Sequence, residues 1–340
     1  MEKKLDKYVE EALYYYDLPG LCVSVSKGAF AYKKAVGFKN FITKEPLATE
    51  NVFHLCSVSK LFTATGIMQL WEAGRLTPNT KLAEVLPWFT LADERFKSIE
   101  LRHMLSHTSG IGDVDDYHWD RPRTDEAALK DYAMSDEVRQ SKLLFDPSEG
   151  KFSYSNIAYE LLGCIIAEVS GLSFEDYMQK HILEPLGMEA STFLTFERKE
   201  ETLAMPYVKD RENHIQPVEH YPYTREHAPS STLTSNLADL EKWGKAHLGR
   251  TLLKEETYKA AFNQYAEVPN NGEGMGYSWF IRKQNGFTLF GHEGTDDGFR
   301  SSFWICPELD CQITVLSNLS KSPVKRISKQ LFNLLTKEDE

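Results

Sequence analysis

A chain of 340 residues, 41% of them hydrophobic, is long enough to bury a large core, either as two lobes or as one lobe with a long insertion. Its 50 acidic and 39 basic side chains give a formal net charge of −11, which disfavours nucleic acid as a partner. The charged N-terminus has neither the apolar run of a signal peptide nor a membrane span. As written, the sequence predicts a cytoplasmic protein, or an extracytoplasmic one if a leader was removed.

The N-terminal part of the chain alternates helical and strand patterns. Residues 3–16 have the apolar period of an amphipathic helix. The β-rich runs "LCVSVS" and "FAYKKAV" are joined by Lys27 and Gly28, which predicts a hairpin. From Ser57 to about Gly74 the spacing is helical again, and Ser57 stands where that helix would start.

The rest of the chain is helical first and β-rich afterwards. Helical patterns broken by proline, glycine and aspartate fill the middle, with no convincing pair of strands. Four strand-like runs, "GYSWFIRK", "FTLFGHEG", "RSSFWIC" and "CQITVLSN", precede a helix at 323–336. The order predicts an α/β (α+β) fold with an antiparallel sheet flanked by helices and built from both chain ends. We expect a sheet domain of residues 1–80 and 230–340, a helical domain of residues 81–229, and the active site in the cleft between them.

The stretch "HLCSVSKL" places two serines and a lysine within four residues. On a helix, Ser57 and Lys60 share a face, whereas Ser59 points elsewhere and is expected to pack or cap. A serine hydroxyl becomes nucleophilic when a base takes its proton, and lysine can act as that base only when it is neutral. Burial and nearby cationic or dipolar groups can lower its pKa from about 10.4. The alternative is a chance S-x-x-K tetrapeptide on a helix surface.

Two further stretches carry polar groups suited to a cleft. "FSYSNIAYELLG" places Tyr154 and Asn156 at the N-terminal edge of a predicted helix, and "FGHEGTDDGFR" places His292, Gly294 and Thr295 at the end of a predicted strand. Glycine at a strand end allows a substrate to approach the backbone closely. Taken singly, Tyr154 would be a packed aromatic and His292 a surface residue at a strand end. Together with the serine stretch, they indicate one composite site.

These stretches resemble the active-site motifs of a known superfamily. Ser57-Val58-Ser59-Lys60, Tyr154-Ser155-Asn156 and His292-Glu293-Gly294 are similar to the three motifs of serine β-lactamases and penicillin-binding proteins, most closely those of class C β-lactamase-like hydrolases. Framework stretches such as "MLSHTSGI" and "EPLGM" extend the likeness over nearly the whole chain. The resemblance implies serine acyl-transfer chemistry on a small-molecule or short peptide substrate, without a cofactor.

The resemblance also implies a role for each residue. Ser57 would attack a carbonyl carbon, while Lys60 and Tyr154 share the base and acid work. Asn156 would orient Lys60 and the substrate amide. Backbone N–H groups of Ser57 and Thr295 would form the oxyanion hole, in which each donor typically contributes about 10² to 10³ in rate.

The third motif departs from the pattern of most penicillin-recognising members, because His292 replaces their lysine. Glu293, Asp296 and Asp297 follow it, so the local field would repel a carboxylate unless Arg300 offsets them. We therefore expect a neutral or amine-bearing ester, small amide or peptide as substrate. Three alternatives stay open: these acids lie on a solvated loop without a role, the substrate carries a carboxylate as for a DD-peptidase or β-lactamase, or the protein is a non-catalytic, acylatable binding or sensor protein.

A metal site is the main competing interpretation of the histidines. His103 and His107 have the i, i+4 spacing of a helical zinc site, but Met104 stands where the H-E-x-x-H motif has glutamate. The sequence instead predicts a structural role at a helix end, with His107 bonded to nearby backbone.

Overall fold

One large antiparallel sheet dominates the computed structural model, which describes residues 1–198 and 200–336. Within this part of the chain the sheet has nine strands in the order β3-β2-β1-β13-β12-β11-β10-β9-β8. Strands from the two ends of the sequence meet where β1 pairs with β13, as predicted. The strands are β1 (Gly20–Lys27), β2 (Phe30–Asn40), β3 (Glu45–Pro46), β8 (Ala266–Val268), β9 (Glu273–Met275), β10 (Phe280–Gln284), β11 (Phe287–Asp296), β12 (Phe299–Cys306) and β13 (Cys311–Ser317).

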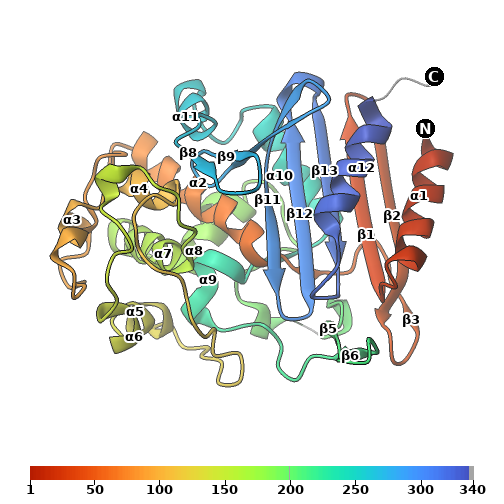
Figure 1. Ribbon diagram of the computed structural model, residues 1–340, viewed down its shortest axis with the longest axis horizontal. Coiled ribbons are helices and arrows are strands. Elements are labelled where there is room, and N and C mark those ends of the chain that lie inside the picture. The colour runs from red at the N-terminus through yellow and green to blue at the C-terminus, as the bar shows by residue number, and fades with distance from the viewer. Residues whose placement is uncertain (199, 337–340) are drawn as a thin grey trace.

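Helices cover both faces of this sheet and form a separate group beside it (Figure 1). The two terminal helices, α1 and α12, lie in front of the sheet in this view, and α10 lies behind it. The remaining helices gather to the left, on the side of β11 rather than of β1. The helices are α1 (Glu2–Tyr15), α2 (Ser59–Glu72), α3 (Leu82–Val85), α4 (Leu101–Leu105), α5 (Ala128–Ala133), α6 (Asp136–Arg139), α7 (Asn156–Ser170), α8 (Phe174–Met178), α9 (Ala228–Ser231), α10 (Leu237–Leu248), α11 (Glu255–Ala261) and α12 (Val324–Thr336).

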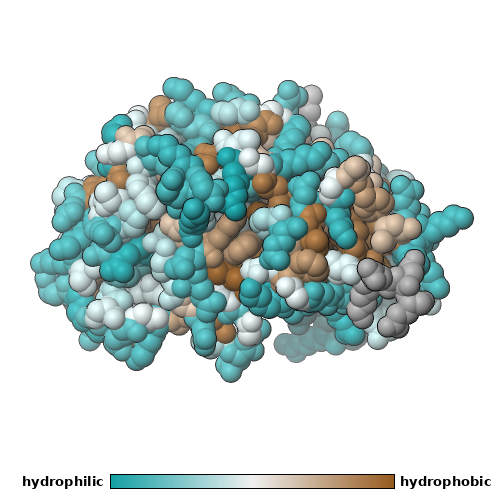
Figure 2. Space-filling view, turned by 90° about the horizontal axis from the view of Figure 1, so that it is seen from above, coloured by the Kyte–Doolittle hydropathy of each residue, from teal (hydrophilic) through white to brown (hydrophobic). Residues whose placement is uncertain are grey.

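Two apolar cores follow from this layering. Leu5 and Val9 of α1 pack with Leu331 of α12 against one face of the sheet. Phe62 of α2 stacks on Trp243 of α10 in the larger core, which continues into the helical group. Viewed from above, hydrophilic side chains cover the periphery, and hydrophobic ones gather near the middle of the face (Figure 2). The predicted fold class is confirmed, since helices flank an antiparallel sheet built from both chain ends.

The middle of the chain differs from the prediction in one respect. A short hairpin of β5 (Tyr207–Lys209) and β6 (Ile215–Pro217) lies there, although no strand pair was expected. Its strands are only three residues long, which is too short for an alternating pattern to stand out. A second small pair, β4 (Phe53–His54) with β7 (Thr234–Ser235), ties the chain before Ser57 to the segment before α10.

The predicted domain boundaries, 1–80 with 230–340 and 81–229, stay a prediction. None of the described helices is by itself both long and apolar enough to cross a membrane; α7 meets the criterion only together with the segment Phe174–Leu183, from which it is bent by 77°.

Candidate active site

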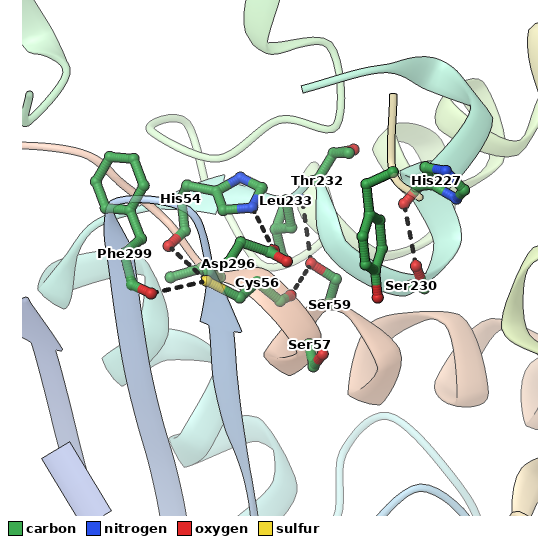
Figure 3. A network of polar contacts seen from close by, with 12 residues as sticks. His54, Cys56, Ser57, Ser59, His227, Ser230, Thr232, Leu233, Asp296 and Phe299 are labelled. Carbon is green, nitrogen blue, oxygen red and sulfur yellow. Dashed lines mark hydrogen bonds and ion pairs between the residues drawn. The ribbon is translucent and has the colours of Figure 1, made fainter. Parts of the chain in front are cut away.

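Ser57 lies in a 3₁₀ turn, Cys56–Val58, immediately before α2. The regular helix begins two residues later than predicted, at Ser59. Cys56 has a φ of 52°, a left-handed conformation that is uncommon for a residue with a side chain. This bend joins β4 to the helix. Figure 3 shows His54, Cys56 and Asp296 on one side of Ser57, with Ser230 on the other.

The second serine of the motif supports the backbone. The Ser59 hydroxyl donates to the Cys56 carbonyl oxygen at 2.7 Å and accepts from the Leu233 N–H at 3.1 Å (Figure 3). Ser59 is fully buried. The packing role expected for Ser59 is confirmed, and only Ser57 of the two serines faces the cavity described below.

Lys60 is fully buried beside Ser57 and has three hydrogen-bond partners. Its Nζ lies 3.2 Å from the Ser57 Oγ, 2.5 Å from the Asn156 Oδ1 and 2.8 Å from the carbonyl oxygen of Ser230. The first partner comes from the adjacent turn, the second from α7 and the third from α9. The predicted neighbours of Lys60 are therefore brought together, and Ser230 is an addition that sequence reasoning missed.

Burial makes Lys60 easier to deprotonate. Desolvation lowers its pKa from 10.5 to about 8, against the opposing charges of Glu160, Asp113 and Asp296 and the smaller effect of Cys56. A neutral amine is therefore accessible near physiological pH. The acids around it limit how far the pKa falls.

Tyr154 and Asn156 stand at the start of α7. The Ser155 hydroxyl caps this helix by accepting from the Ala158 N–H. Both side chains line the same cavity as Ser57. Burial raises the pKa of Tyr154 well above 10, while the neighbouring Ser57 hydroxyl opposes that rise. Within the described residues the Tyr154 hydroxyl forms no well-aligned hydrogen bond.

His107 supports this motif from behind. Its Nδ1 accepts from the Ser155 N–H at 3.1 Å, and its ring stacks on Tyr154 with the centroids 4.3 Å apart. His103 is engaged separately, because its Nδ1 accepts from the Glu100 N–H. The predicted structural role of His107 is confirmed, and the two histidines do not form a zinc pair.

The residues of the third motif lie on β11. His292 is buried, and its Nδ1 lies 2.6 Å from the Glu293 carbonyl oxygen. Desolvation, with a smaller effect of Lys60, lowers the pKa of His292 to about 3, so the ring is neutral. Gly294 packs against the turn that holds Ser57: a Cβ there would come within 2.4 Å of the Leu55 carbonyl oxygen. Thr295 follows it and lines the cavity with Ser57.

The acids beside His292 are not arranged as expected. Glu293 accepts from Arg282 at 2.9 Å and from Trp304 at 2.8 Å. Asp296 is buried 2.7 Å from His54 Nε2, and neither acid lies on a solvated loop. Asp297 alone is exposed.

Arg300 does not offset these acids. Its guanidinium donates to the Ser320 carbonyl oxygen, and its side chain does not line the cavity around Ser57. The substrate-binding role predicted for Arg300 stays a prediction, and this geometry does not favour it.

One cavity of about 390 Å³ is lined by the predicted residues Ser57, Tyr154, Asn156, His292 and Thr295, but not by Lys60, Gly294 or Arg300. Two larger cavities, of about 440 and 560 Å³, contain none of the predicted residues, so size alone would select the wrong place. The chemistry of the lining identifies the candidate site. The side chains lining the smaller cavity are Ser57, Tyr117, Tyr154, Asn156, Asn271, Glu273, Phe280, His292, Glu293, Thr295 and Lys325.

Several of these residues escaped sequence reasoning. Tyr117 accepts from Asn156 Nδ2 at 2.5 Å, and Glu273 forms ion pairs with Arg282 and with Lys325, each at 2.9 Å. They come from a loop, a short strand and the last helix, so no spacing connects them to the motifs. The one available signal was the tyrosine in "YHWDRPR", a stretch that could line a substrate groove but whose residue types more often lie in a core or at a rim.

One buried cluster combines types of side chain that bind metals. Ligand atoms of His54, Cys56 and Asp296 all lie within 4.8 Å of one another (Figure 3). Burial, reinforced by the charge of Asp296, raises the pKa of Cys56 well above 9, which keeps the thiol protonated. The direct contact between His54 and Asp296 accounts for this cluster as a hydrogen-bonded pair.

Comparison with known proteins identifies the family to which this chain belongs. The beta-lactamase family profile matches residues 5–337. Penicillin-binding protein 4 of Amycolatopsis lactamdurans is 27% identical over 316 residues, 89% of this chain and 81% of the relative. Protein flp of Staphylococcus aureus strain MW2 is 27% identical over 339 residues, 97% of this chain but 66% of flp, just under two thirds of its length. The octameric penicillin-binding protein homologue from Pyrococcus abyssi has a TM-score of 0.86 at 29% identity, covering 98% of this chain and 77% of the homologue. Because the family profile spans almost the whole chain, the protein belongs to the beta-lactamase family.

Proposed function

We propose that this protein is a serine hydrolase that cleaves esters, small amides or peptides through an acyl-enzyme on Ser57. The hydrogen bonding of Lys60 carries the proposal. Asn156 Oδ1 and the Ser230 carbonyl oxygen can only accept, so they hold two N–H bonds of a neutral Lys60. The lone pair then faces the third neighbour, the Ser57 hydroxyl. This arrangement suits proton transfer from Ser57 to Lys60.

Tyr154 suits the complementary acid role. Its raised pKa keeps the phenol protonated, and its hydroxyl lies in the cavity wall beside Ser57. A protonated phenol without a firm hydrogen bond can donate to a departing alkoxide or amine. The resemblance implied only that Lys60 and Tyr154 share the base and acid roles. We assign the role of base to Lys60 and the role of acid to Tyr154.

The reaction then follows in two halves. Ser57 Oγ attacks the carbonyl carbon as Lys60 takes its proton, and backbone N–H groups of Ser57 and Thr295 stabilise the oxyanion. The leaving group departs with a proton from Tyr154, which Lys60 restores. Water then attacks the acyl-enzyme carbonyl and gives one proton to Lys60, which passes it to Ser57 Oγ as the acyl–oxygen bond breaks. The acid product leaves and loses the second proton to solvent, giving the carboxylate.

The charges in the cavity bear on the alternative carboxylate-bearing substrates of a DD-peptidase or β-lactamase. His292 is neutral, so it supplies no cation in place of the usual lysine. Lys325 lines the cavity but is paired with Glu273. A substrate carboxylate would have to compete with Glu273 for Lys325. This favours substrates that lack a carboxylate.

Labelling of Ser57 tests the proposal. A fluorophosphonate should add one label to the wild type, detected by intact-mass spectrometry, and peptide mapping should place it on Ser57. The Ser57→Ala variant should take no label and lose at least about 10⁴-fold in kcat on any substrate of the wild type. Ser59→Ala is the matched control, since it removes the neighbouring hydroxyl and should still be labelled. An unlabelled wild type, or label on another residue, would refute the proposal.

Turnover separates the enzyme from an acylatable sensor. A panel of p-nitrophenyl acetate, p-nitrophenyl butyrate, D-alanine p-nitroanilide and a chromogenic cephalosporin should give product continuously with at least one substrate. A stoichiometric burst on Ser57 with no later release on every member of the panel would instead identify a sensor.

A further inference from the structure

One carboxylate beside the site has no ion-pair partner among residues 1–198 and 200–336. Asp113 is exposed and lies in the loop after α4. Its Oδ1 accepts three N–H groups: the backbone and side-chain amides of Asn156, each at 2.8 Å, and the backbone of Val114 at 2.9 Å. The described residues place no lysine, arginine or histidine in ion-pair contact with it.

Asp113 is close to the reacting atoms. Its Oδ1 contacts Asn156, whose amide oxygen contacts Lys60, which in turn contacts Ser57 at 3.2 Å. Tyr117, which lines the cavity, shares the same Asn156 amide nitrogen. An acyl group attached to Ser57 would therefore have its α-substituent near the Asn156 and Tyr117 wall. Asp113 is not among the side chains lining the cavity, but it is bonded to Asn156 and exposed at the edge of that wall.

The opposite wall of the cavity is balanced in charge. Arg282 and Lys325 are matched by Glu273 and Glu293 through direct ion pairs. The ring of His292 is neutral. Asp296 is buried against His54. Lys60 is neutral in the reactive form proposed above. Asp113 is therefore an exposed carboxylate without an ion-pair partner that is bonded directly to a side chain of the cavity wall.

We propose that Asp113 recognises a protonated amine next to the scissile carbonyl, so that the substrates are amino-acid esters, amides or short peptides with a free α-amine. This inference rests on the proposed serine hydrolase function and names its substrate class. The free carboxylate oxygen of Asp113 accepts from the ammonium, and the Tyr117 hydroxyl borders the same position. The amine-bearing class expected from the sequence is retained, with a different acid responsible for it.

An isosteric pair of substrates tests this inference. D-alanine p-nitroanilide and isobutyryl p-nitroanilide differ mainly in an ammonium replacing a methyl group. In the wild type the kcat/KM ratio should favour the alanine compound by about tenfold or more near neutral pH. The ratio should fall as the amine loses its proton, around a pH of about 8 for an α-amine. The ionisation of Lys60 affects both substrates and cancels in the ratio.

Two variants identify the residue responsible. Asp113→Asn keeps an oxygen acceptor for Asn156 but removes the charge, so it should cut the ratio about tenfold. The charge of Asp113 also raises the pKa of Lys60, an effect that is common to both substrates and cancels in the ratio. Asp115→Asn, a charge removal at an exposed position in the same loop, should behave like the wild type. An equal loss on both substrates, or an unchanged ratio, would overturn the inference. A wild type that is labelled at Ser57 yet shows no preference for the amine would overturn it too, and would leave the serine hydrolase proposal standing.

Discussion

At the scale of single residues, the proposed base Lys60 depends on a buried acid two contacts away. Glu160 lies one helical turn after Asn156 on α7 and is fully buried. Its Oε1 accepts from the Ser230 hydroxyl at 2.5 Å and lies 3.1 Å from His227 Nδ1. Ser230 in turn offers its carbonyl oxygen to Lys60. Glu160 therefore holds one partner of Lys60 in place and adds a negative charge nearby.

The pH profile should report both Lys60 and this charge. Protonated Lys60 cannot take a proton, so kcat/KM should rise with pH, with a midpoint near the Lys60 pKa of about 8. The charge of Glu160 raises that pKa. Its removal in Glu160→Gln should therefore move the midpoint to lower pH, by roughly half a unit or more. The measurement is kcat/KM against pH on a substrate without titratable groups.

A matched variant distinguishes the effect of the Glu160 charge from the structural support that Glu160 gives to Ser230. Glu168→Gln, on the same helix but exposed and bonded to Trp88, should leave the midpoint in place. If Glu160→Gln lowers kcat without moving the midpoint, then Glu160 acts only as a structural support for Ser230.

At the scale of elements, the site depends on how closely β11 approaches the turn before α2. A Cβ on Gly294 would lie 2.2 Å from the Ser301 Oγ, 2.4 Å from the Leu55 carbonyl oxygen and 2.9 Å from the Cys56 Cβ. The Ser301 hydroxyl also donates to the Leu55 carbonyl oxygen across this contact. Because Gly294 has no side chain, β11 can approach the turn closely enough to bring the two proposed oxyanion donors, the N–H groups of Ser57 and Thr295, close together.

A methyl group at this position should push the two elements apart. We expect Gly294→Ala to lower kcat by about 10²-fold or more, because small displacements of aligned groups have effects of that size. Gly112→Ala is the control, since a Cβ there meets nothing within 4 Å. Steady-state kinetics with circular dichroism would check this. A folded Gly294→Ala variant with near-native kcat would show that β11 does not hold an oxyanion donor.

The elements themselves were largely predictable because their signals are local. The hairpin of β1 and β2, the four C-terminal strands and the terminal helices follow from apolar spacing over a few residues. The start of α2 was misplaced by two residues. The helix begins later because Cys56 adopts a left-handed backbone conformation and residues Cys56–Val58 form a 3₁₀ turn. Cysteine has no preference for the left-handed conformation, so the sequence does not predict it.

At the scale of the whole molecule, the site could be predicted only as far as its motifs. Ser57 and Lys60 are three residues apart, and their shared face follows from helix geometry. In contrast, the hydrogen-bond partners of the acidic side chains cannot be predicted from the spacing of residues in the sequence. Asp296 is bonded to His54, 242 residues away, and Asp113 is bonded to Asn156, 43 residues away. The sequence therefore indicated a surplus of acid at the third motif, whereas folding pairs Glu293 and Asp296 and leaves Asp297 exposed. The other acid without an ion-pair partner near the site, Asp113, lies far from that motif in the sequence.

The N-terminal helix is expected to be essential to the site, although it lies far from it. Its buried side chains cover β1, and hydrogen bonds then run through β13 and β12 to β11, which carries Thr295. Val9→Asp would bury an unpaired charge at a fully buried position, which costs several kcal/mol out of a total stability of about 5–15. We expect its melting temperature to fall by about 10 °C or more, with fluorophosphonate labelling of Ser57 lost over the same temperature range. Tyr15→Asp, on the same helix but 75% exposed, is the matched control. If Val9→Asp melts like the wild type, or keeps its labelling after the sheet has melted, then the two ends of the chain do not form one cooperative unit.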